Sequence, residues 1–384
     1  MREFSDDLTV NRRTFLAQGA AGAGLALTAG VAQAQEAAPS PPGEVPMRTL
    51  GRTGMKVSEV SVGAMRTSEP AILQAAFDRG VNYVDTARGY MGGRNESIVG
   101  EAIKGRRDSL FVATKVGAVT PKAEIMKSMD ESLRALGTDY VDVFQLHMPV
   151  VADVLHPDAK EACAELKQQG KIKFSGVTTH SDQAAVLDAV ATDPDRFYDV
   201  VLVAYNFESP PEIGAAIDRA AAAGLGIIAM KTQAGGYKTD TMPGATPHQA
   251  AIKWVLQNPN IHCCVPAMVN LQEVVEDTGA MGLKLTRADE EALAEYARYT
   301  RSRYCRLCKE CLGSCPLGVD IPTVNRSLMY ADGYNDYGLA QETYARLPLH
   351  LSAAACTNCE TCTARCVKGL NIPANMARAK TLFA

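Results

Sequence analysis

The chain has 384 residues, enough for two or three domains, and 47% of them are hydrophobic, enough for a large core. Its 39 Lys and Arg residues against 43 Asp and Glu give a net charge of −4, and no basic stripe occurs, so the composition argues against a nucleic-acid partner. Eight of the 11 cysteines lie between residues 305 and 366, and the other three sit in apolar contexts typical of core positions.

Residues 1–34 have the order of a secretory signal: a charged start, an uncharged Ala- and Gly-rich stretch at 17–34, and an A-x-A cleavage site that ends at Ala34. Arg12 and Arg13 precede an apolar pair, and this run resembles a twin-arginine signal. The resemblance implies the twin-arginine export machinery and a periplasmic or otherwise exported mature protein. A membrane anchor is the alternative, but the stretch is shorter than the ~20 apolar residues of a spanning helix, so we expect no permanent membrane span.

A Pro-rich linker is expected at residues 35–46, and from residue 47 to about residue 300 short apolar runs alternate with amphipathic stretches. Several runs are unbroken apolar blocks, such as VVLVAY and GIIAM, as expected of parallel strands buried on both faces. The runs predict strands at 57–65, 81–87, 110–116, 141–148, 172–177, 200–205, 226–230 and 261–265.

Helical patterns lie between these strands, for example at 121–136 and 157–169. Eight strand–helix repeats predict a (β/α)8 TIM barrel of the α/β class. A doubly wound sheet is the alternative, but no G-x-G-x-x-G motif follows the first strand. Residues 47–56 predict a hairpin that closes the bottom of the barrel, and residues 286–301 predict a helix that leads into a small C-terminal domain at 301–384.

Four polar residues stand at or just after the ends of predicted strands. Asp85 ends the second strand, Tyr90 follows in the next loop, and Lys115 and His147 end the third and fourth. Barrel enzymes carry their chemistry at the carboxyl ends of the strands, so these residues predict a proton-transfer set. An ammonium lowers the pKa of a nearby tyrosine, and a carboxylate can hold the ammonium in place, so Tyr90 can act as a general acid. Singly, each has a structural explanation, such as a helix cap or a core histidine.

The same residues lie in stretches that resemble the aldo/keto reductase family over residues 47–300: DTARGY, NESIVGEAI, ATK and QLH. The resemblance implies that Asp85, Tyr90, Lys115 and His147 form the catalytic tetrad. Tyr90 would protonate the oxygen of a small carbonyl substrate, or act in reverse on an alcohol, while Lys115 and Asp85 tune it and His147 orients the substrate. The resemblance also implies a nicotinamide dinucleotide across the barrel mouth.

The nucleotide positions match the family less well, since GVTTH stands where the family has G-V-S-N. No Lys or Arg occurs at residues 266–283, where the family binds the 2′-phosphate of NADP, and Glu273 lies there. A phosphate without a cationic partner is disfavoured, so we expect NAD(P) with NAD favoured over NADP. The candidate contacts that the resemblance implies are Thr178, Thr179, Asn206, Lys231, Pro266, Ala267 and Met268.

The C-terminal region contains the run C-x2-C-x2-C-x3-C twice, and the tails CPLGVDIP and CVKGLNIP repeat as well. A duplicated run predicts a duplicated metal module. Zinc and disulfides are the alternatives, but zinc sites usually use two C-x2-C pairs, and thiols this close together cannot all form separate bridges. Pro316 follows the first run, whereas Val367 stands in the same place after the second.

This region resembles the bacterial two-cluster ferredoxins over residues 300 to 384, and the resemblance implies two 4Fe–4S clusters with exchanged fourth ligands. Iron–sulfur clusters are inserted inside the cell and the twin-arginine route carries folded proteins, so this feature supports the export signal. The first cluster would be bound by Cys305, Cys308, Cys311 and Cys366, and the second by Cys356, Cys359, Cys362 and Cys315.

The mature chain as a whole resembles aldo/keto reductases that carry such a module. We expect an exported iron–sulfur oxidoreductase with carbonyl/alcohol chemistry in the barrel and electron exchange, through the clusters, with an electron-transfer protein. One alternative is an electron-transfer protein whose barrel is a catalytically degenerate docking scaffold. The other is an ordinary reductase with structural clusters. A hydride carries two electrons and each cluster normally exchanges one, so the coupling of the two parts is the open mechanistic question.

Overall fold

The computed structural model describes residues 45–117, 121–235, 246–301 and 303–383. The expected signal peptide at 1–34 lies outside the described residues, and so does the expected linker apart from Val45 and Pro46. The described residues belong to one compact unit. The division into a barrel at 47–300 and a cluster domain at 301–384 stays a prediction.

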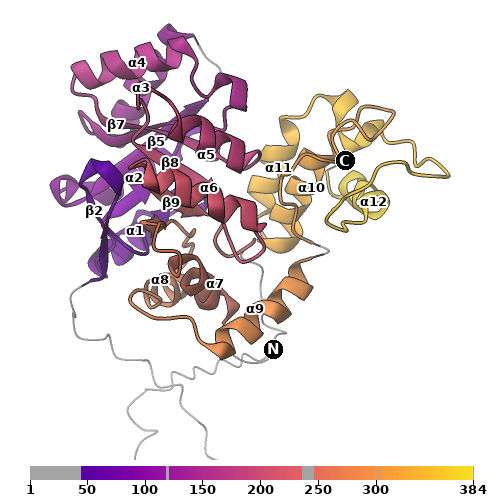
Figure 1. The fold of residues 1–384 in the computed structure, drawn as a ribbon. Coiled ribbons are helices and arrows are strands. Elements are labelled where there is room, and N and C mark those ends of the chain that lie inside the picture. The colour runs from indigo at the N-terminus through magenta and orange to yellow at the C-terminus, as the bar shows by residue number, and fades with distance from the viewer. Residues whose placement is uncertain (1–44, 118–120, 236–245, 302, 384) are drawn as a thin grey trace, which may run out of the picture. The chain divides into compact units, whose positions relative to one another are not determined.

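The centre of this unit is a barrel of eight parallel strands (Figure 1). The two ends of the sheet meet through a bridge between Val60 and Cys264 and through a 2.9 Å hydrogen bond from the backbone nitrogen of Gly63 to the carbonyl of Pro266. The predicted (β/α)8 barrel is therefore confirmed. Its strands, in sheet order, are β10 (Cys263–Cys264), β9 (Gly226–Met230), β8 (Val200–Ala204), β7 (Ile172–Thr179), β6 (Val141–His147), β5 (Phe111–Gly117), β4 (Tyr83–Asp85) and β3 (Val62–Gly63).

The strands are apolar on both faces because each face has its own core. In β8, Val200 and Leu202 belong to the cluster inside the barrel, whereas Val201 and Val203 belong to the cluster between the barrel and its helices. The surrounding helices are α1 (Pro70–Asp78), α2 (Asn95–Ile103), α3 (Lys122–Leu136), α4 (Pro157–Gln168), α5 (Gln183–Ala191), α6 (Pro211–Ala222), α7 (Pro247–Leu256), α8 (Leu271–Thr278) and α9 (Arg287–Thr300).

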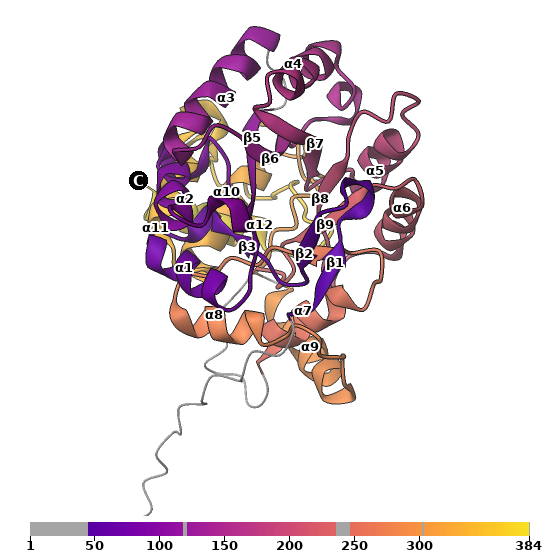
Figure 2. The same ribbon diagram turned by 90° about the vertical axis from the view of Figure 1, so that its left-hand side faces the viewer.

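The predicted hairpin is present as β1 (Met47–Thr49) and β2 (Lys56–Ser58), which lie across the end of the barrel nearest the viewer in Figure 2. Between them, Leu50 is fully buried in the barrel's interior cluster. The Leu50 side chain packs so closely on Gly226, at the start of β9, that a Cβ atom on Gly226 would lie 2.7 Å from Cγ of Leu50. The hairpin therefore closes the amino end of the barrel, as predicted.

The ends of several strands differ from the predictions. The run at 57–65 supplies the last residues of β2 and only Val62–Gly63 of the barrel, because a turn held by the 2.8 Å hydrogen bond from Ser58 Oγ to the carbonyl of Val60 separates the two. The run at 261–265 supplies only Cys263–Cys264. Conversely, β5 continues to Gly117, so Lys115 lies inside its strand rather than at the end.

The C-terminal region adds helices α10 (Ile321–Leu328), α11 (Tyr337–Ala345) and α12 (Ile372–Leu382), with a π-helical turn, η6 (Met329–Gly333), directly after α10. It has its own apolar cluster, which includes six of the eight cysteines of the two runs. The repeated tails fold alike, since Gly318 and Gly369 both have left-handed φ angles, of 74° and 87°, and Asp320 and Asn371 cap α10 and α12. No helix among the described residues is long and apolar enough to cross a membrane.

Candidate active site and cluster ligands

Neighbouring strands bring the four predicted catalytic residues to one end of the barrel. Asp85 is the last residue of β4, Lys115 lies on β5, and His147 is the last residue of β6. Tyr90 begins the short 3-10 helix η3 (Tyr90–Gly93), which follows β4. The carboxyl ends of parallel strands meet at the same edge, and the structure shows that these four side chains do converge there.

Lys115 connects the set. Its ammonium nitrogen donates hydrogen bonds to Asp85 Oδ1 (2.5 Å), the carbonyl of Thr86 (2.7 Å) and the hydroxyl of Tyr90 (3.2 Å). The Lys115 side chain is only 1% exposed. Burial lowers the pKa of Lys115, but the Asp85 carboxylate and Tyr90 outweigh this effect and leave the pKa above its ordinary value. Lys115 is therefore charged at neutral pH.

Burial raises the pKa of Tyr90 above its ordinary value, and the Lys115 ammonium lowers it by less. The expected net lowering of this pKa is therefore wrong, because desolvation of the phenolate outweighs one nearby charge. Tyr90 stays protonated at neutral pH, as a proton donor requires. The ring of His147 meets that of Tyr90 edge-on, with centroids 5.9 Å apart, and burial together with Lys115 and Lys231 lowers the pKa of His147 to about 3. His147 is thus a neutral imidazole.

Two supporting interactions were not predicted. Gln145 Nε2 donates to Asp85 Oδ2 at 2.8 Å, so both oxygens of the carboxylate are held. At the start of α2, Asn95 accepts a hydrogen bond from Thr86 (2.6 Å) and donates one to the carbonyl of Ala64 (2.8 Å). Gln145 lies in the QLH stretch and Asn95 in the NESIVGEAI stretch, so the resemblance of these stretches to the family could have identified both residues.

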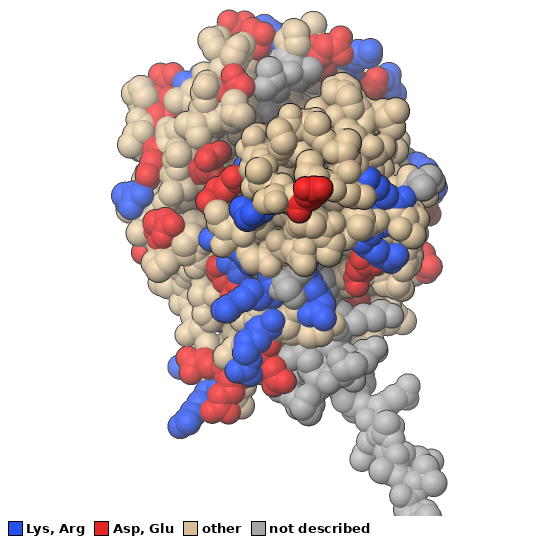
Figure 3. Space-filling model, turned by 90° about the vertical axis from the view of Figure 1, so that its right-hand side faces the viewer, with Lys and Arg blue, Asp and Glu red and all other residues tan. Residues whose placement is uncertain are grey.

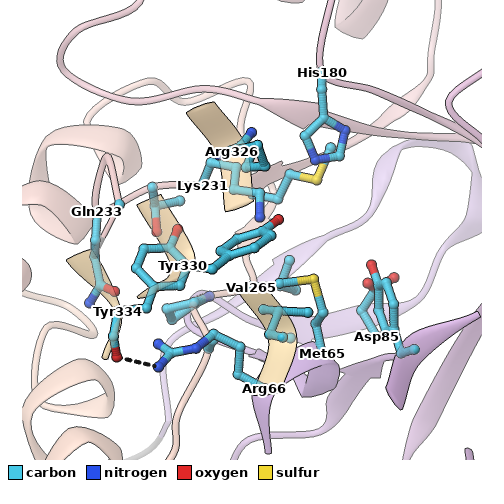
Figure 4. Close-up of a pocket in the computed structure, with 18 of the residues that line it drawn as sticks. Met65, Arg66, Asp85, His180, Lys231, Gln233, Val265, Arg326, Tyr330 and Tyr334 are labelled. Carbon is cyan, nitrogen blue, oxygen red and sulfur yellow. Dashed lines mark hydrogen bonds between the residues drawn. The ribbon is translucent and has the colours of Figure 1, made fainter. Parts of the chain in front are cut away.

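A cavity of about 430 Å³ opens at this end of the barrel, and residues of the barrel and of the C-terminal region line it together (Figure 4). Arg66 ties the two sides, since it donates to the carbonyl of Tyr334 (3.1 Å), pairs with Asp336 (3.5 Å) and lies 4.5 Å from the centroid of the Tyr334 ring. The lining from the C-terminal region comprises Leu307, Thr323, Arg326, Tyr330, Tyr334, Leu339, Glu342, Thr343 and Arg346.

The predicted nucleotide contacts divide into two groups. Lys231, Pro266 and Ala267 line the cavity, whereas Thr178, Thr179, Asn206 and Met268 are buried and do not. Thr178 Oγ1 accepts from the backbone nitrogen of Met148, and Thr179 Oγ1 donates to the carbonyl of Ser181. Asn206 donates to the carbonyl of Lys231 at 2.9 Å. Binding of the nicotinamide carboxamide by these three residues stays a prediction. It would require each side chain to replace its present hydrogen bond with one to the carboxamide.

Three acidic residues, Glu273, Glu276 and Asp277, line the part of the cavity formed by α8. Glu273 accepts hydrogen bonds from the backbone nitrogen of Val269 (2.9 Å) and from Asn270 (3.1 Å). Burial raises the pKa of Asp277 well above its usual range, and Glu276 and Glu273 raise it further. This lining offers no cation to a 2′-phosphate.

None of the eight cysteines of the two runs forms a disulfide, and neither do the other three. Cys305, Cys308, Cys311 and Cys366 lie close enough for the charges of Cys366 and Cys308 to raise the pKa of both Cys305 and Cys311, although burial is the larger cause. These four are the residues implied for the first cluster. In a 4Fe–4S cluster each thiolate binds a different iron, so its ligands lie farther apart than around one ion. No three Cys, His, Asp or Glu residues of the described ranges are spaced for a single-ion site.

In comparisons with known proteins, one family model matches the barrel and another matches the C-terminal region. Residues 54–243 match the model of the aldo/keto reductase family, and residues 304–371 match that of a 4Fe-4S dicluster domain. The second match contains all eight cysteines of the two runs.

Individual relatives agree with the first match. An uncharacterised oxidoreductase of Bacillus subtilis is 38% identical over 148 residues, which cover 34% of this chain and 48% of the relative, so the match spans about half of that relative. L-galactose dehydrogenase of Arabidopsis thaliana is 28% identical over 300 residues, covering 66% and 93%. A solved aldo/keto reductase of Klebsiella pneumoniae in complex with NADP and acetate is 25% identical, with a TM-score of 0.55 and coverage of 66% of this chain and 94% of that one. The expected preference for NAD is not supported by that complex.

Proposed function

Because the chain is an oxidoreductase of the aldo/keto reductase type with a 4Fe–4S dicluster domain, we propose that it interconverts a carbonyl and an alcohol in the cavity at the barrel mouth and exchanges electrons through two clusters. The observation that carries this proposal is the hydrogen-bonded set in which Lys115 joins Asp85 to Tyr90 beside that cavity. The cavity is lined by both parts of the chain, which supports their acting together.

Each residue of the set has a role that follows from its surroundings. Tyr90, protonated because of its raised pKa, donates a proton to the carbonyl oxygen. The Lys115 ammonium stabilises the phenolate as the proton leaves, and Asp85, held by Gln145, keeps the ammonium in place. The neutral His147 imidazole orients the substrate oxygen. A nicotinamide held near Lys231, Pro266 and Ala267 would supply the hydride.

Electron exchange with a protein partner belongs to the same proposal. The cysteines named above would bind the two clusters, and each cluster would transfer one electron at a time. Three apolar residues within two positions of a cluster cysteine are exposed: Leu312 (56%), Leu317 (42%) and Val367 (58%). Figure 3 shows the side of the molecule on which the C-terminal region lies, and its central part carries few charged side chains. Exposed apolar side chains on a sparsely charged surface suit transient docking of an electron-transfer protein.

Export by the twin-arginine route completes the proposal. It is supported by the arginine pair at residues 12 and 13, by the uncharged stretch at 17–34, and by the need to insert clusters before transport. Substitution of both arginines by lysine should leave the full-length protein, with its clusters, in the cytoplasmic fraction. Unchanged export of that variant would contradict the route.

The catalytic proposal is tested by Tyr90→Phe, which removes one hydroxyl. Loss of a general acid typically costs 10²–10⁴-fold in rate, so we expect kcat for aldehyde reduction to fall by about that factor while the visible absorption of the clusters is unchanged. Tyr140→Phe is the matched control, since the Tyr140 ring lies against Arg107 and Lys173 and does not line the cavity. Full turnover by Tyr90→Phe would sink the proposal.

A second candidate function is electron transfer by a protein whose barrel no longer turns over a substrate. The observation that favours it is that Thr178, Thr179 and Asn206 already use their side chains in hydrogen bonds to their own chain. It predicts that calorimetry with NADH and NADPH detects no binding. A micromolar affinity for either nucleotide would exclude this candidate.

A further inference from the structure

Two cations that line the cavity have no carboxylate partner among the described residues. Lys231 makes no ion pair, and Arg326 has a single hydrogen bond, to the sulfur of Met329 at 3.2 Å. Arg326 is only 4% exposed, and its Nε atom has no partner. The other cations of the lining are paired: Arg66 with Asp336 and Arg346 with Glu342.

Lys231 and Arg326 come from different parts of the chain and meet in the cavity. Lys231 directly follows β9, and Arg326 lies on α10. Figure 4 shows both on the same side of the cavity as Tyr330, away from Asp85. Lys231 has a left-handed backbone, with φ of 58°, which the hydrogen bond from Asn206 to its carbonyl holds. Such a conformation is unfavourable for lysine, so the fold maintains it at a cost.

Arg326 is buried and Lys231 is half-buried, and the aromatic contact of Arg326 is the ring of Tyr330, with Cζ 5.7 Å from its centroid. Like charges that are removed from water without a carboxylate partner destabilise a protein, and they are typical of sites where a ligand supplies the missing charge. Burial, Arg326, Arg66 and Lys115 together lower the pKa of Lys231 to about 7. Asp85 is bound by Lys115 and Glu342 by Arg346. Among the described residues, the three acids of α8 form no ion pair with Lys231 or Arg326 either. The remaining titratable groups of the cavity lining are Tyr90, His147, His180, His248, Glu273, Glu276, Asp277, Tyr330 and Tyr334.

We propose that Lys231 and Arg326 form an anion-binding subsite that takes a carboxylate or phosphate group, so that the substrate is a carbonyl compound bearing such a group. The subsite exists only where the barrel and the C-terminal region meet. The assignment of the anion to the substrate rests on the proposed function, whereas the subsite itself does not.

Arg326 also lies near Cys305, a ligand implied for the first cluster, since its charge lowers the pKa of Cys305 against the larger effect of burial. The visible absorption of the clusters is therefore measured for each Arg326 variant, to show that the clusters are still bound. Lys231 is the sharper probe, because Arg326, Arg66 and Lys115 are the charges that act on it and no cluster cysteine is among them.

The test is calorimetry on the whole protein, with its clusters intact and without nucleotide, using 4-carboxybenzaldehyde and the neutral 4-methylbenzaldehyde. A charge-assisted hydrogen bond corresponds to about 10- to 100-fold in affinity. We expect Lys231→Met and Arg326→Met each to weaken binding of the carboxylate by about that factor, with no effect on the neutral aldehyde. Arg326→Lys should retain more affinity than Arg326→Met. Lys127→Met, on the exposed face of α3, is the control.

Proton uptake gives a second readout that a structural role would not change. An anion raises the pKa of Lys231, so at pH 8 the wild-type protein should take up protons when 4-carboxybenzaldehyde binds, as measured in two buffers of different ionisation enthalpy. Lys231→Met should take up none. Equal affinity of the wild-type protein for both aldehydes, or unchanged carboxylate affinity in Lys231→Met, would overturn the subsite.

Two further outcomes separate the sources of the anion and the two proposals. If Lys231→Met weakens NADH instead, and leaves the carboxylate aldehyde unaffected, the diphosphate of the dinucleotide occupies the subsite and the substrate assignment is overturned. If the carboxylate aldehyde binds as expected but is never reduced with either nucleotide, the subsite stands and the proposed function fails.

Discussion

At the scale of single residues, the site depends on one buried ion pair. Lys115 and Asp85 are 1% and 5% exposed in their side chains, and each satisfies the other's charge. Removal of one partner of such a pair leaves an uncompensated charge in a place where water cannot reach it. The pair therefore contributes to the stability of the fold as well as to the proposed catalysis, and the two roles can be separated by substitution.

Lys115→Met should lower the free energy of unfolding by about 3–5 kcal/mol, because it leaves the Asp85 carboxylate unpaired. The double variant Asp85→Asn with Lys115→Met should lose less than the sum of the two single variants, since both charges are gone. Denaturant unfolding under anaerobic conditions, followed by far-UV circular dichroism, measures this. Strict additivity would show that the pair is not coupled as the geometry indicates.

The stability of the folded chain should also depend on Lys231. Its folded pKa of about 7 lies below its ordinary value, so between pH 7 and the ordinary value of about 10.4 the unfolded chain holds a proton that the folded chain has lost. The free energy of unfolding therefore rises with pH across this window. We expect Lys231→Met to exceed the wild type most in thermal midpoint at pH 6–7, with the difference shrinking toward pH 10. A difference that is constant with pH would contradict this.

The convergence of Asp85, Tyr90, Lys115 and His147 could be predicted from short stretches such as DTARGY, because those residues stand at or near the ends of recognisable strands. The direction of the Tyr90 pKa could not, since it is decided by how completely the folded protein removes water from the phenol. The proximity of Arg326 to Lys231 could not be predicted either, because the two residues are 95 positions apart (326 − 231).

At the scale of elements, the two cysteine loops and the helices that follow them form a repeated unit. The tails after Cys315 and Cys366 both turn through a left-handed glycine into a capped helix, with equal hydrogen bonds of 3.0 Å from Gly318 to Cys315 and from Gly369 to Cys366. The repeat was readable from sequence because glycine and the capping residues Asp320 and Asn371 each have a specific conformational role. The ends of the strands could be predicted less well, because the closure of the barrel decides which residues of β3 and β10 pair.

The exchange of ligands between the loops predicts how paired substitutions combine. With two 4Fe–4S clusters the wild type holds about eight irons, and any single Cys→Ala in either set should leave about four. Cys305→Ala with Cys366→Ala should still leave about four, because both residues belong to one cluster. Cys356→Ala with Cys366→Ala should leave about none. Iron analysis of anaerobically purified protein measures this, and the reverse pattern would show that each run binds its own cluster.

At the scale of the whole molecule, the barrel and the C-terminal region share contacts that no local pattern predicts. Tyr296 and Ala234 belong to the same apolar cluster as Met329, Tyr330 and Ala340. Arg306 forms an ion pair with Glu208, and Arg66 reaches Asp336. The sequence predicted two domains joined by a helix, but it held no signal that residues of the second would line the cavity of the first.

These shared contacts predict that the two parts unfold together. The single tryptophan, Trp254 on α7, reports on the barrel by fluorescence, and visible absorption reports on the clusters. We expect the two signals to change at the same denaturant concentration under anaerobic conditions. Loss of the clusters while the Trp254 signal remains native would show that the C-terminal region is an independent domain.

The measurement that tests the central claim most directly is anaerobic titration of the purified mature protein with NADH and then with NADPH, followed by the visible absorption of the clusters. If the cavity joins the two parts, a nucleotide that enters the barrel should bleach the clusters, and the titration shows which of the two nucleotides does so. Clusters that dithionite reduces but neither nucleotide bleaches would contradict electronic coupling between the barrel and the clusters.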